Sequence, residues 1–224
     1  QLAFLADKIC QQFGCRLCFD KQIDRYVGKE WPVLGHTMIG RRRLQNIRAL
    51  CAFVDGQDID GCWVECGVWR GGASIYAAAC LKEPRNIYLY DSFEGLPFDP
   101  TEPSFFSFDN LAVSQTEVEQ NFINYGFAIE LGWRICLKKG WFKDTLHKHQ
   151  EPIAILRADG DTFASTIQIL SSLYDMVVPK GYVIIDDYNL EPCRKAIDHF
   201  FKVRCLPMPH YFTIDDCAIY WRKL

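Results

Sequence analysis

The sequence predicts an α/β fold, in which helices cover both faces of a mostly parallel sheet. Short apolar segments of strand length alternate with segments whose apolar residues recur at helical spacing, which is the pattern of βαβ units. The clearest unit runs from the strand Ile153–Leu156 through the helix Phe163–Tyr174 to the strand Tyr182–Ile185. A further indication is the glycine-rich turn Gly67–Gly72, which follows a predicted strand and opens a helix.

The other elements follow in chain order. Residues 1–55 are expected to form a helical cap that ends in the helix His36–Val54, and residues 61–224 the α/β core, so that residues 1–224 make one domain. The core elements around the unit above are the strand Cys62–Cys66, the helix Ser74–Leu81, the strands Asn86–Tyr90 and Arg134–Leu137, the helix Ile197–Val203, and a hairpin of Tyr211–Ile214 with Cys217–Trp221. Together these segments supply a seven-stranded sheet.

An insertion at residues 96–112 interrupts the alternation of strands and helices. It is rich in proline and phenylalanine, with Pro97, Pro100 and Pro103 among Phe98, Phe105, Phe106 and Phe108. Loops of this length are usually functional or disordered. Because binding residues concentrate on loops, the aromatic content favours a lid over a substrate pocket.

Bulk composition excludes several classes of protein. The chain has 224 residues and a net charge of −3, so it offers no basic surface for nucleic acid. It shows no apolar run of membrane-spanning length and no signal peptide, which predicts a cytoplasmic protein without a membrane partner. Most of the 11 cysteines are expected to be buried free thiols. Cys10, Cys15 and Cys18 have an iron–sulfur spacing, but they fall on the predicted amphipathic helix Ala3–Cys18, which disfavours a cluster.

Carboxylates follow the two strands of the clearest βαβ unit. Asp159 comes after the first strand, and Asp186 and Asp187 come directly after the second. The carboxyl ends of parallel strands meet at one edge of the sheet, where such folds bind ligands. Acids this close repel one another unless a proton or a cation joins them, and all-oxygen ligands favour Mg²⁺ or Ca²⁺. The sequence therefore predicts a metal site, with Asp161 interpreted as the N-cap of the following helix.

The glycine-rich turn favours S-adenosylmethionine over a dinucleotide. Its glycines are spaced G-x-x-x-G-G rather than G-x-G-x-x-G, and Glu65 places a carboxylate at the turn, which suits a ligand with an ammonium group. Asp91, at the end of the next strand, is placed to accept hydrogen bonds from ribose hydroxyls. Trp141 and Phe142 follow the third strand and are expected to sandwich the adenine.

Several sequence blocks resemble the macrocin O-methyltransferase family. The blocks are HTMIG (36–40), VECGVWRGGASI (64–75), DSFEGLP (91–97), LAVS…VEQNF…YG (111–126), KGWFKDTL (139–146), LRADGD (156–161), GYVIIDDY (181–188) and IYWRK (219–223). They cover about residues 25–223 in collinear order. The resemblance implies a Rossmann-like class I methyltransferase fold, and an enzyme that uses S-adenosylmethionine and Mg²⁺ to methylate sugar hydroxyls of glycosylated natural products.

The resemblance also implies roles for individual residues. The implied Mg²⁺ ligands are Asp159, Asp186 and Asp187, and the implied cofactor contacts are Met38, Ile39, Glu65, Gly67, Ser74, Asp91, Ser92, Trp141 and Phe142. The chain departs from the family pattern at Cys66, Ala158 and His147, none of which removes a carboxylate or a turn glycine. The cap and the lid match least, so the identity of the acceptor does not transfer.

Methyl transfer to a sugar hydroxyl needs the oxygen to be held and deprotonated. Mg²⁺ would stabilise the developing alkoxide and fix the oxygen near the methyl group, and Asp159 is the first candidate for the general base, with His36 the second. A catechol acceptor would satisfy the same metal chemistry. A homodimer is a further expectation, from apolar helices in the cap.

Two further functions are less favoured by the sequence. A phosphotransferase or phosphatase is suggested by the D-x-D form of Asp159-Gly160-Asp161, but this segment follows the fourth strand, whereas such motifs normally follow the first. A degenerate, non-catalytic methyltransferase is disfavoured because the three acids and the turn glycines are all retained.

Overall fold

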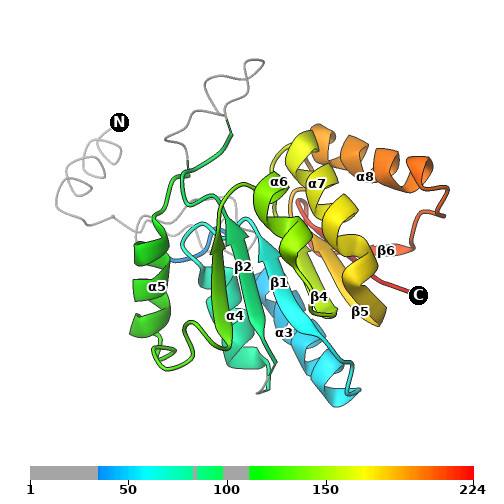
Figure 1. The fold of residues 1–224 in the computed structure, drawn as a ribbon. Helices are drawn as coiled ribbons and strands as arrows, with labels where there is room; N and C mark the ends of the chain where they lie inside the picture. Colours follow the sequence, from blue (N-terminus) through cyan, green and yellow to red (C-terminus); the bar gives the residue numbers. More distant parts are fainter. Residues whose placement is uncertain (1–34, 83–84, 98–110) are drawn as a thin grey trace, which may run out of the picture.

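The computed structural model describes residues 35–82, 85–97 and 111–224 (Figure 1). These residues form one seven-stranded sheet in the order β3-β2-β1-β4-β5-β7-β6. The strands are β1 (Cys62–Cys66), β2 (Ile87–Asp91), β3 (Ile135–Lys139), β4 (Ile153–Ala158), β5 (Val177–Ile185), β6 (Tyr211–Thr213) and β7 (Ile219–Arg222). Strands β1 to β5 run parallel, whereas β7 pairs antiparallel with both β5 and β6. The predicted mostly parallel sheet of seven strands is confirmed, including its C-terminal hairpin.

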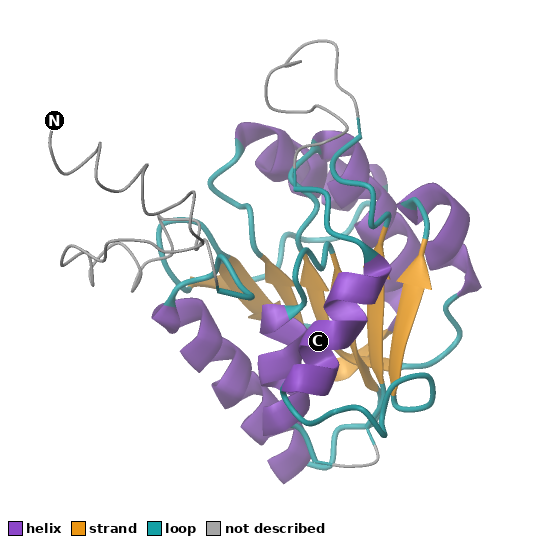
Figure 2. Ribbon diagram, turned by 90° about the vertical axis from the view of Figure 1, so that its left-hand side faces the viewer, coloured by secondary structure: helices purple, strands orange, loops and turns teal. Residues whose placement is uncertain are grey.

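Helices cover both faces of this sheet (Figures 1 and 2). They are α3 (Arg41–Gly56), α4 (Gly72–Cys80), α5 (Gln115–Asn124), α6 (Phe142–Thr145), α7 (Phe163–Leu173) and α8 (Glu191–Val203), with short 3₁₀ turns η1 (Leu146–Lys148) and η2 (Tyr174–Met176). The central strands alternate their side chains between two buried clusters. In β1, Trp63 joins the cluster that contains residues of α3 and α4, while Cys62 and Val64 join the one with residues of α7 and α8. Burial on both faces explains the continuous apolar runs of the sequence.

The helix predicted at His36–Val54 begins only at Arg41. Residues 36–40 instead cross the glycine-rich turn, where the amide of Gly72 donates to the carbonyl oxygen of His36 at 2.7 Å. A Cβ atom on Gly72 would lie 2.2 Å from that oxygen, so the crossing requires glycine. The rest of the helix, α3, packs on the sheet through buried Ile47 and Val54 among others. This part of the expected cap therefore belongs to one of the helical layers.

The Pro179-Lys180-Gly181 segment has residues typical of a turn, but it lies within β5. The pairing of β5 with β4 shifts its register there, and Lys180 has a positive φ of 71°, as at a bulge. The segment remains in the sheet because the amide of Lys180 donates to the carbonyl of Lys223, and the amide of Lys223 to the carbonyl of Gly181.

Two helices, α5 and α6, have no counterpart in the sequence prediction. The signal for α5 is present in the sequence, because Ser114 and Glu117 have the spacing of a capping box. In the structure the Ser114 hydroxyl accepts from the amide of Glu117 at 3.1 Å. Helix α8 also begins earlier than predicted, at Glu191 rather than Ile197, with a proline in its first turn.

Some expectations fall outside the described residues. These are the cap up to residue 34, which holds Cys10, Cys15 and Cys18, and residues 98–110 of the predicted lid. They stay predictions. Within the described ranges, no helix combines the length and apolarity needed to cross a bilayer.

Candidate functional site

A cavity of about 620 Å³ opens at the carboxyl edge of the sheet, where β1, β2, β4 and β5 end, a size typical of small-molecule sites. Nearly all of the predicted site residues line it: His36, Met38, Ile39, Glu65, Gly67, Asp91, Ser92, Trp141, Phe142, Asp159, Asp186 and Asp187. Ser74 does not line the cavity, because it is fully buried behind Glu65. The sheet therefore gathers residues that lie far apart in the sequence at one edge.

Asp91, the last residue of β2, fixes the glycine-rich turn. Its Oδ2 accepts from the amide of Val68 at 2.7 Å and from that of Trp69 at 3.3 Å, and its Oδ1 accepts from Phe93 at 2.8 Å. Burial raises the pKa of the Asp91 carboxyl, and these hydrogen bonds act in the opposite direction. The residue predicted to bind ribose thus also shapes the turn beside it.

Gly67 brings this turn against the end of β4. Its φ is +89°, and a Cβ atom would lie 1.9 Å from the carbonyl oxygen of Asp159. The amide of Asp159 in turn donates to the carbonyl of Cys66 at 2.9 Å. The glycine-rich turn and the first predicted metal ligand are therefore in direct backbone contact.

Glu65 lies under the cavity with only 1% of its surface exposed. Arg157 Nη1 lies 2.5 Å from its Oε1, and the hydroxyl of Ser74 donates to its Oε2. Burial raises the pKa of Glu65 to about 7, although Arg157 and Ser74 lower it. Ser74 also accepts from the indole of Trp63 at 2.8 Å, so its observed contacts position Glu65 rather than reach into the cavity.

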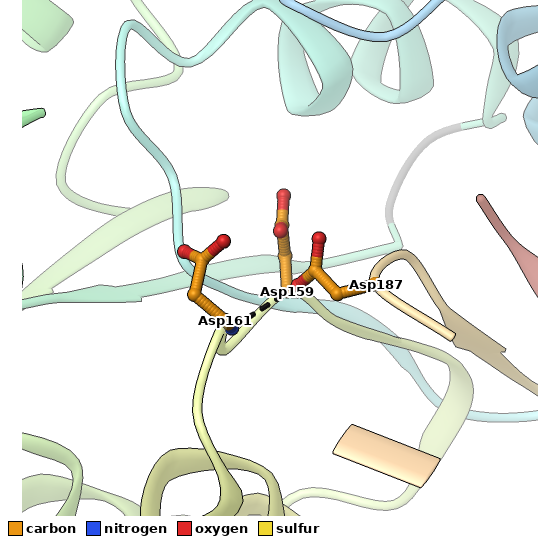
Figure 3. Close-up of side chains that lie close together, drawn as sticks. All are labelled: Asp159, Asp161 and Asp187. Carbon is orange, nitrogen blue, oxygen red and sulfur yellow. Dashed lines mark hydrogen bonds between the residues drawn. The ribbon is translucent and has the colours of Figure 1, made fainter. Parts of the chain in front are cut away.

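Three carboxylates converge in the cavity beyond β4 (Figure 3). One oxygen from each of Asp159, Asp161 and Asp187 lies within 4.8 Å of the others. The amide of Asp161 donates to Asp187 Oδ2 at 3.1 Å. The interpretation of Asp161 as a helix cap is wrong: Thr162 caps α7, since its hydroxyl accepts from the amide of Ser165 at 3.0 Å. The chain turns at Asp161 with a positive φ of 55°, and its carboxylate joins the cluster.

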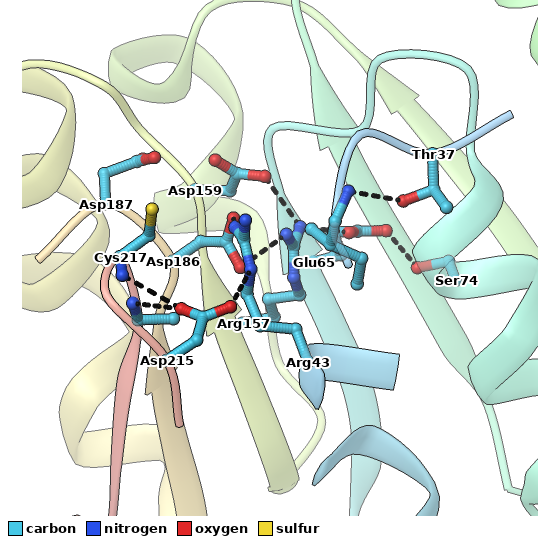
Figure 4. A network of polar contacts seen from close by, with 12 residues as sticks. Thr37, Arg43, Glu65, Ser74, Arg157, Asp159, Asp186, Asp187, Asp215 and Cys217 are labelled. Atoms are coloured by element: carbon cyan, nitrogen blue, oxygen red, sulfur yellow. Dashed lines mark hydrogen bonds and ion pairs between the residues drawn. The ribbon is translucent and has the colours of Figure 1, made fainter. Parts of the chain in front are cut away.

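Asp186 takes a different position from its neighbour Asp187 (Figure 4). Its Oδ2 lies 2.5 Å from Arg43 Nη1, and its Oδ1 lies 2.8 Å from Arg157 Nη2. Arg157 also contacts Asp159 Oδ2 at 2.7 Å. In the structure Asp186 is thus paired with two buried guanidinium groups, while Asp161 joins the converging carboxylates.

The converging carboxylates fit a divalent cation. Burial raises the pKa values of Asp159, Asp161 and Asp187, with a further rise from the neighbouring carboxylates, and that of Asp161 reaches about 7. A cation would relieve this repulsion, and an all-oxygen donor set suits Mg²⁺. A sequence signal for Asp161 exists, because it lies only two residues after Asp159 at the end of a predicted strand. Arg43 lies in a distant helix, and no local sequence pattern marks it.

His36 also lines the cavity, in the segment that crosses the glycine-rich turn. Its ring packs edge-on against Tyr125 at a centroid distance of 5.5 Å. Its Nδ1 is buried and has no hydrogen-bond partner among the described residues. Trp141 and Phe142, at the start of α6, are half-buried and also line the cavity.

Comparison with known proteins shows the family to which this chain belongs. The family model for macrocin O-methyltransferase (TylF) matches residues 9–223. Demethyldecarbamoylnovobiocin O-methyltransferase of Streptomyces niveus is 38% identical over 89% of this chain and 80% of its own. A Streptomyces olivaceus enzyme, 8-demethyl-8-(2,3-dimethoxy-alpha-L-rhamnosyl)-tetracenomycin-C 4'-O-methyltransferase, is 35% identical over 88% of this chain and 79% of its own.

Solved structures agree with this fold. The O-methyltransferase NovP superposes with a TM-score of 0.84 at 37% identity, covering 91% of this chain and 88% of NovP. TomG of Streptomyces achromogenes, solved in complex with S-adenosylmethionine, has a TM-score of 0.58 at 10% identity over 100% of both chains, which shows the shared fold alone. The chain thus has the fold of class I S-adenosylmethionine-dependent O-methyltransferases, and it belongs to the macrocin O-methyltransferase (TylF) family.

Proposed function

We propose that this enzyme transfers the methyl group of S-adenosylmethionine to a hydroxyl of a sugar in a glycosylated natural product, with the help of Mg²⁺. The observation that carries the proposal is the cavity that joins a glycine-rich turn to converging carboxylates. The name of the Streptomyces olivaceus relative specifies a rhamnosyl acceptor, which favours a sugar over a catechol.

The cofactor side of the cavity is formed by the turn and the segment that crosses it. Asp91 would accept hydrogen bonds from the ribose hydroxyls, and Ser92 lies beside it. Met38 and Ile39 add apolar walls, and Trp141 and Phe142 would hold the adenine. Gly67 lets the cofactor approach the backbone of the turn. Glu65 lines the cavity and, in its ionised form, would attract the positively charged amino group of the cofactor.

The cation side is formed by the converging carboxylates. Asp159 and Asp187 would hold Mg²⁺, with Asp161 as the third oxygen donor in the geometry of the structure. Bound there, Mg²⁺ would supply charge stabilisation for a developing alkoxide. Asp186 also lines the cavity and would act through its arginine partners, Arg43 and Arg157.

Deprotonation of the acceptor hydroxyl falls to residues around the cluster. Asp159 remains the first candidate for the general base and His36 the second, since both line the cavity. The structure adds Asp161, which lines the same cavity and lies within the cluster. His36→Asn isolates the histidine, because it leaves the carboxylates in place: loss of the base lowers kcat by on the order of 10²–10⁴-fold with Mn²⁺ and cofactor affinity nearly unchanged. For Asp159→Asn and Asp161→Asn, kcat is compared at saturating Mn²⁺, because these variants also lose a proposed cation ligand.

The predicted lid, the cysteines and a homodimer concern the surroundings of the site. Leu96, Pro97 and Leu111, at the two ends of the predicted lid, line the cavity, which supports the proposal of a lid. The eight described cysteines are free, which supports a reducing cytoplasmic setting. A homodimer stays a prediction.

Methyl transfer to a panel of glycosides tests the proposal. The enzyme is incubated with S-adenosylmethionine, Mg²⁺ and rhamnosylated acceptors, and products are read by mass spectrometry. We expect a methylated product that is absent for the aglycones and is lost with EDTA or in Asp159→Asn. Methylation of catechols with no methylation of any glycoside would contradict the sugar assignment, and full activity in EDTA would contradict the role of Mg²⁺.

A further inference from the structure

Helix α3 carries a buried arginine between two acidic turns. Arg43 is 7% exposed. Its Nη1 lies 2.5 Å from Asp186 Oδ2, at the end of β5, and its Nε lies 3.0 Å from Asp215 Oδ2, in the turn between β6 and β7 (Figure 4). Both partners are themselves 4% exposed. One guanidinium therefore ties α3 to two separate turns at the same edge of the sheet.

This pairing fixes the direction of the Asp186 side chain, and with it that of Asp187, directly after β5. Asp186 has its two oxygens on two different arginines, Arg43 and Arg157, so its side chain points under the cavity. Asp187 then turns toward Asp159 and Asp161. Asp186 and Asp187 are adjacent in the turn that follows β5, so the direction of one constrains that of the other.

The second partner, Asp215, extends this link to other residues that line the cavity. Asp215 Oδ1 accepts from the amides of Cys217 at 2.9 Å and Ala218 at 3.0 Å, and so holds the β6–β7 turn. The amide of Asn189 donates to the carbonyl of Cys217 at 3.1 Å. Cys217 and Asn189 both line the cavity, so the turn held by Asp215 also braces the loop that carries Asp187.

We propose that Arg43 is a positioning residue for the cation site, which it acts on through Asp186 and Asp215. The inference rests on the proposed binding of a divalent cation by the converging carboxylates. The planar guanidinium, with donors on separate nitrogens, can hold two carboxylates in fixed directions at once. A lysine keeps the charge but presents one ammonium group, so it cannot hold both turns in the same geometry.

Whether a variant of Arg43 binds the cation more weakly or more tightly distinguishes a positioning role from a purely electrostatic one. Removing a positive charge from beside a cation site strengthens cation binding by electrostatics alone. Loss of positioning weakens it instead, and loss of a residue behind a metal ligand typically costs about 10- to 100-fold in metal affinity. Arg43→Lys keeps the charge and removes only the double contact, so its effect on affinity reports positioning.

The experiment measures Mn²⁺ binding to the whole protein by calorimetry, with Mn²⁺ in place of Mg²⁺. The variants are Arg43→Lys and Asp215→Asn, and the control is Arg48→Lys, an exposed arginine on the same helix. We expect Arg43→Lys to weaken Mn²⁺ binding by about tenfold or more, Asp215→Asn to weaken it less, and Arg48→Lys to leave it unchanged. Affinity for S-adenosylhomocysteine should change less than twofold in all three.

The Mn²⁺ measurements test the cation site and the role of Arg43 separately. Wild-type protein that binds no Mn²⁺ would overturn the cation site itself, and with it the role of Arg43. Wild-type binding that Arg43→Lys leaves equal or tighter would overturn the role of Arg43 alone. Where Arg43→Lys does not fold, Asp215→Asn decides, because it leaves the Arg43–Asp186 pair in place, and unchanged Mn²⁺ affinity in that variant would overturn the inference.

Discussion

Gly67 joins the two halves of the site through the backbone. Its positive φ excludes most side chains, and its Cα faces the carbonyl oxygen of Asp159. The glycine-rich turn and the converging carboxylates are therefore held at a fixed separation. In-line methyl transfer needs such a fixed separation, because small errors in the placement of reacting atoms cost large factors in rate.

Gly67→Ala should disrupt both the fold and cofactor binding. A left-handed alanine costs about 1–2 kcal/mol by itself, and at Gly67 the added methyl group must also displace the end of β4. Gly126→Ala is the matched control, because Gly126 has a φ of +93° and nothing within 4 Å of the added Cβ. Urea unfolding and calorimetric titration of S-adenosylhomocysteine measure the two effects. Equal stability and equal affinity in the two variants would contradict the contact with Asp159.

Glu65 should make stability depend on pH. Its pKa is raised from an ordinary value of 4.5 to about 7 by burial, so the folded state binds a proton that the unfolded state has already released between these values. Stability should therefore fall as pH rises through this window, by roughly 3 kcal/mol from this group.

Glu65→Gln should remove this contribution. Urea unfolding at several pH values between 4.5 and 8 compares the wild-type protein with Glu65→Gln and with Glu94→Gln, an exposed glutamate. We expect a flatter pH dependence in Glu65→Gln only. A slope identical in all three proteins would show that Glu65 is ionised throughout the window.

At the scale of elements, the N-terminus of α7 supports the carboxylate cluster. Thr162 caps this helix directly after Asp161. Thr162→Ala should cost about 1 kcal/mol of stability and weaken Mn²⁺ binding, because the loop that carries Asp161 loses its anchor. Ser114→Ala removes the equivalent cap of α5, which lies away from the cluster, and should cost similar stability with no change in Mn²⁺ affinity. Equal Mn²⁺ affinity in both variants would show that the cap of α7 does not support the cation site.

The elements that could be predicted from the sequence are those with strong local patterns. Buried parallel strands give apolar runs, and so β1 is predicted with its observed bounds. The bulge in β5 could not be predicted, because Pro179-Lys180-Gly181 has turn chemistry and stays in the sheet only through its pairing with Lys223. Helix α5 had a capping signal, but its apolar face is short.

For the whole molecule, the sheet topology decides which residues meet. Parallel strands with crossover helices bring the ends of β1, β2, β4 and β5 to one edge, so most of the site could be predicted from strand ends. The different directions of the Asp186 and Asp187 side chains could not be predicted, because Asp186 pairs with Arg43, which lies in a different element 143 residues away. Contacts of this kind carry no local sequence pattern.

In the proposed mechanism, one cavity binds the cofactor at the glycine-rich turn and the cation at the carboxylates. Calorimetric titration of S-adenosylhomocysteine tests it most directly, on wild-type protein with Mg²⁺, on the same protein with EDTA, and on Asp91→Asn. We predict saturable 1:1 binding that persists in EDTA and weakens by about tenfold or more in Asp91→Asn, since hydrogen bonds to a charged group are worth about 1.5–3 kcal/mol. No binding by folded protein, or binding that disappears with EDTA, would contradict the account.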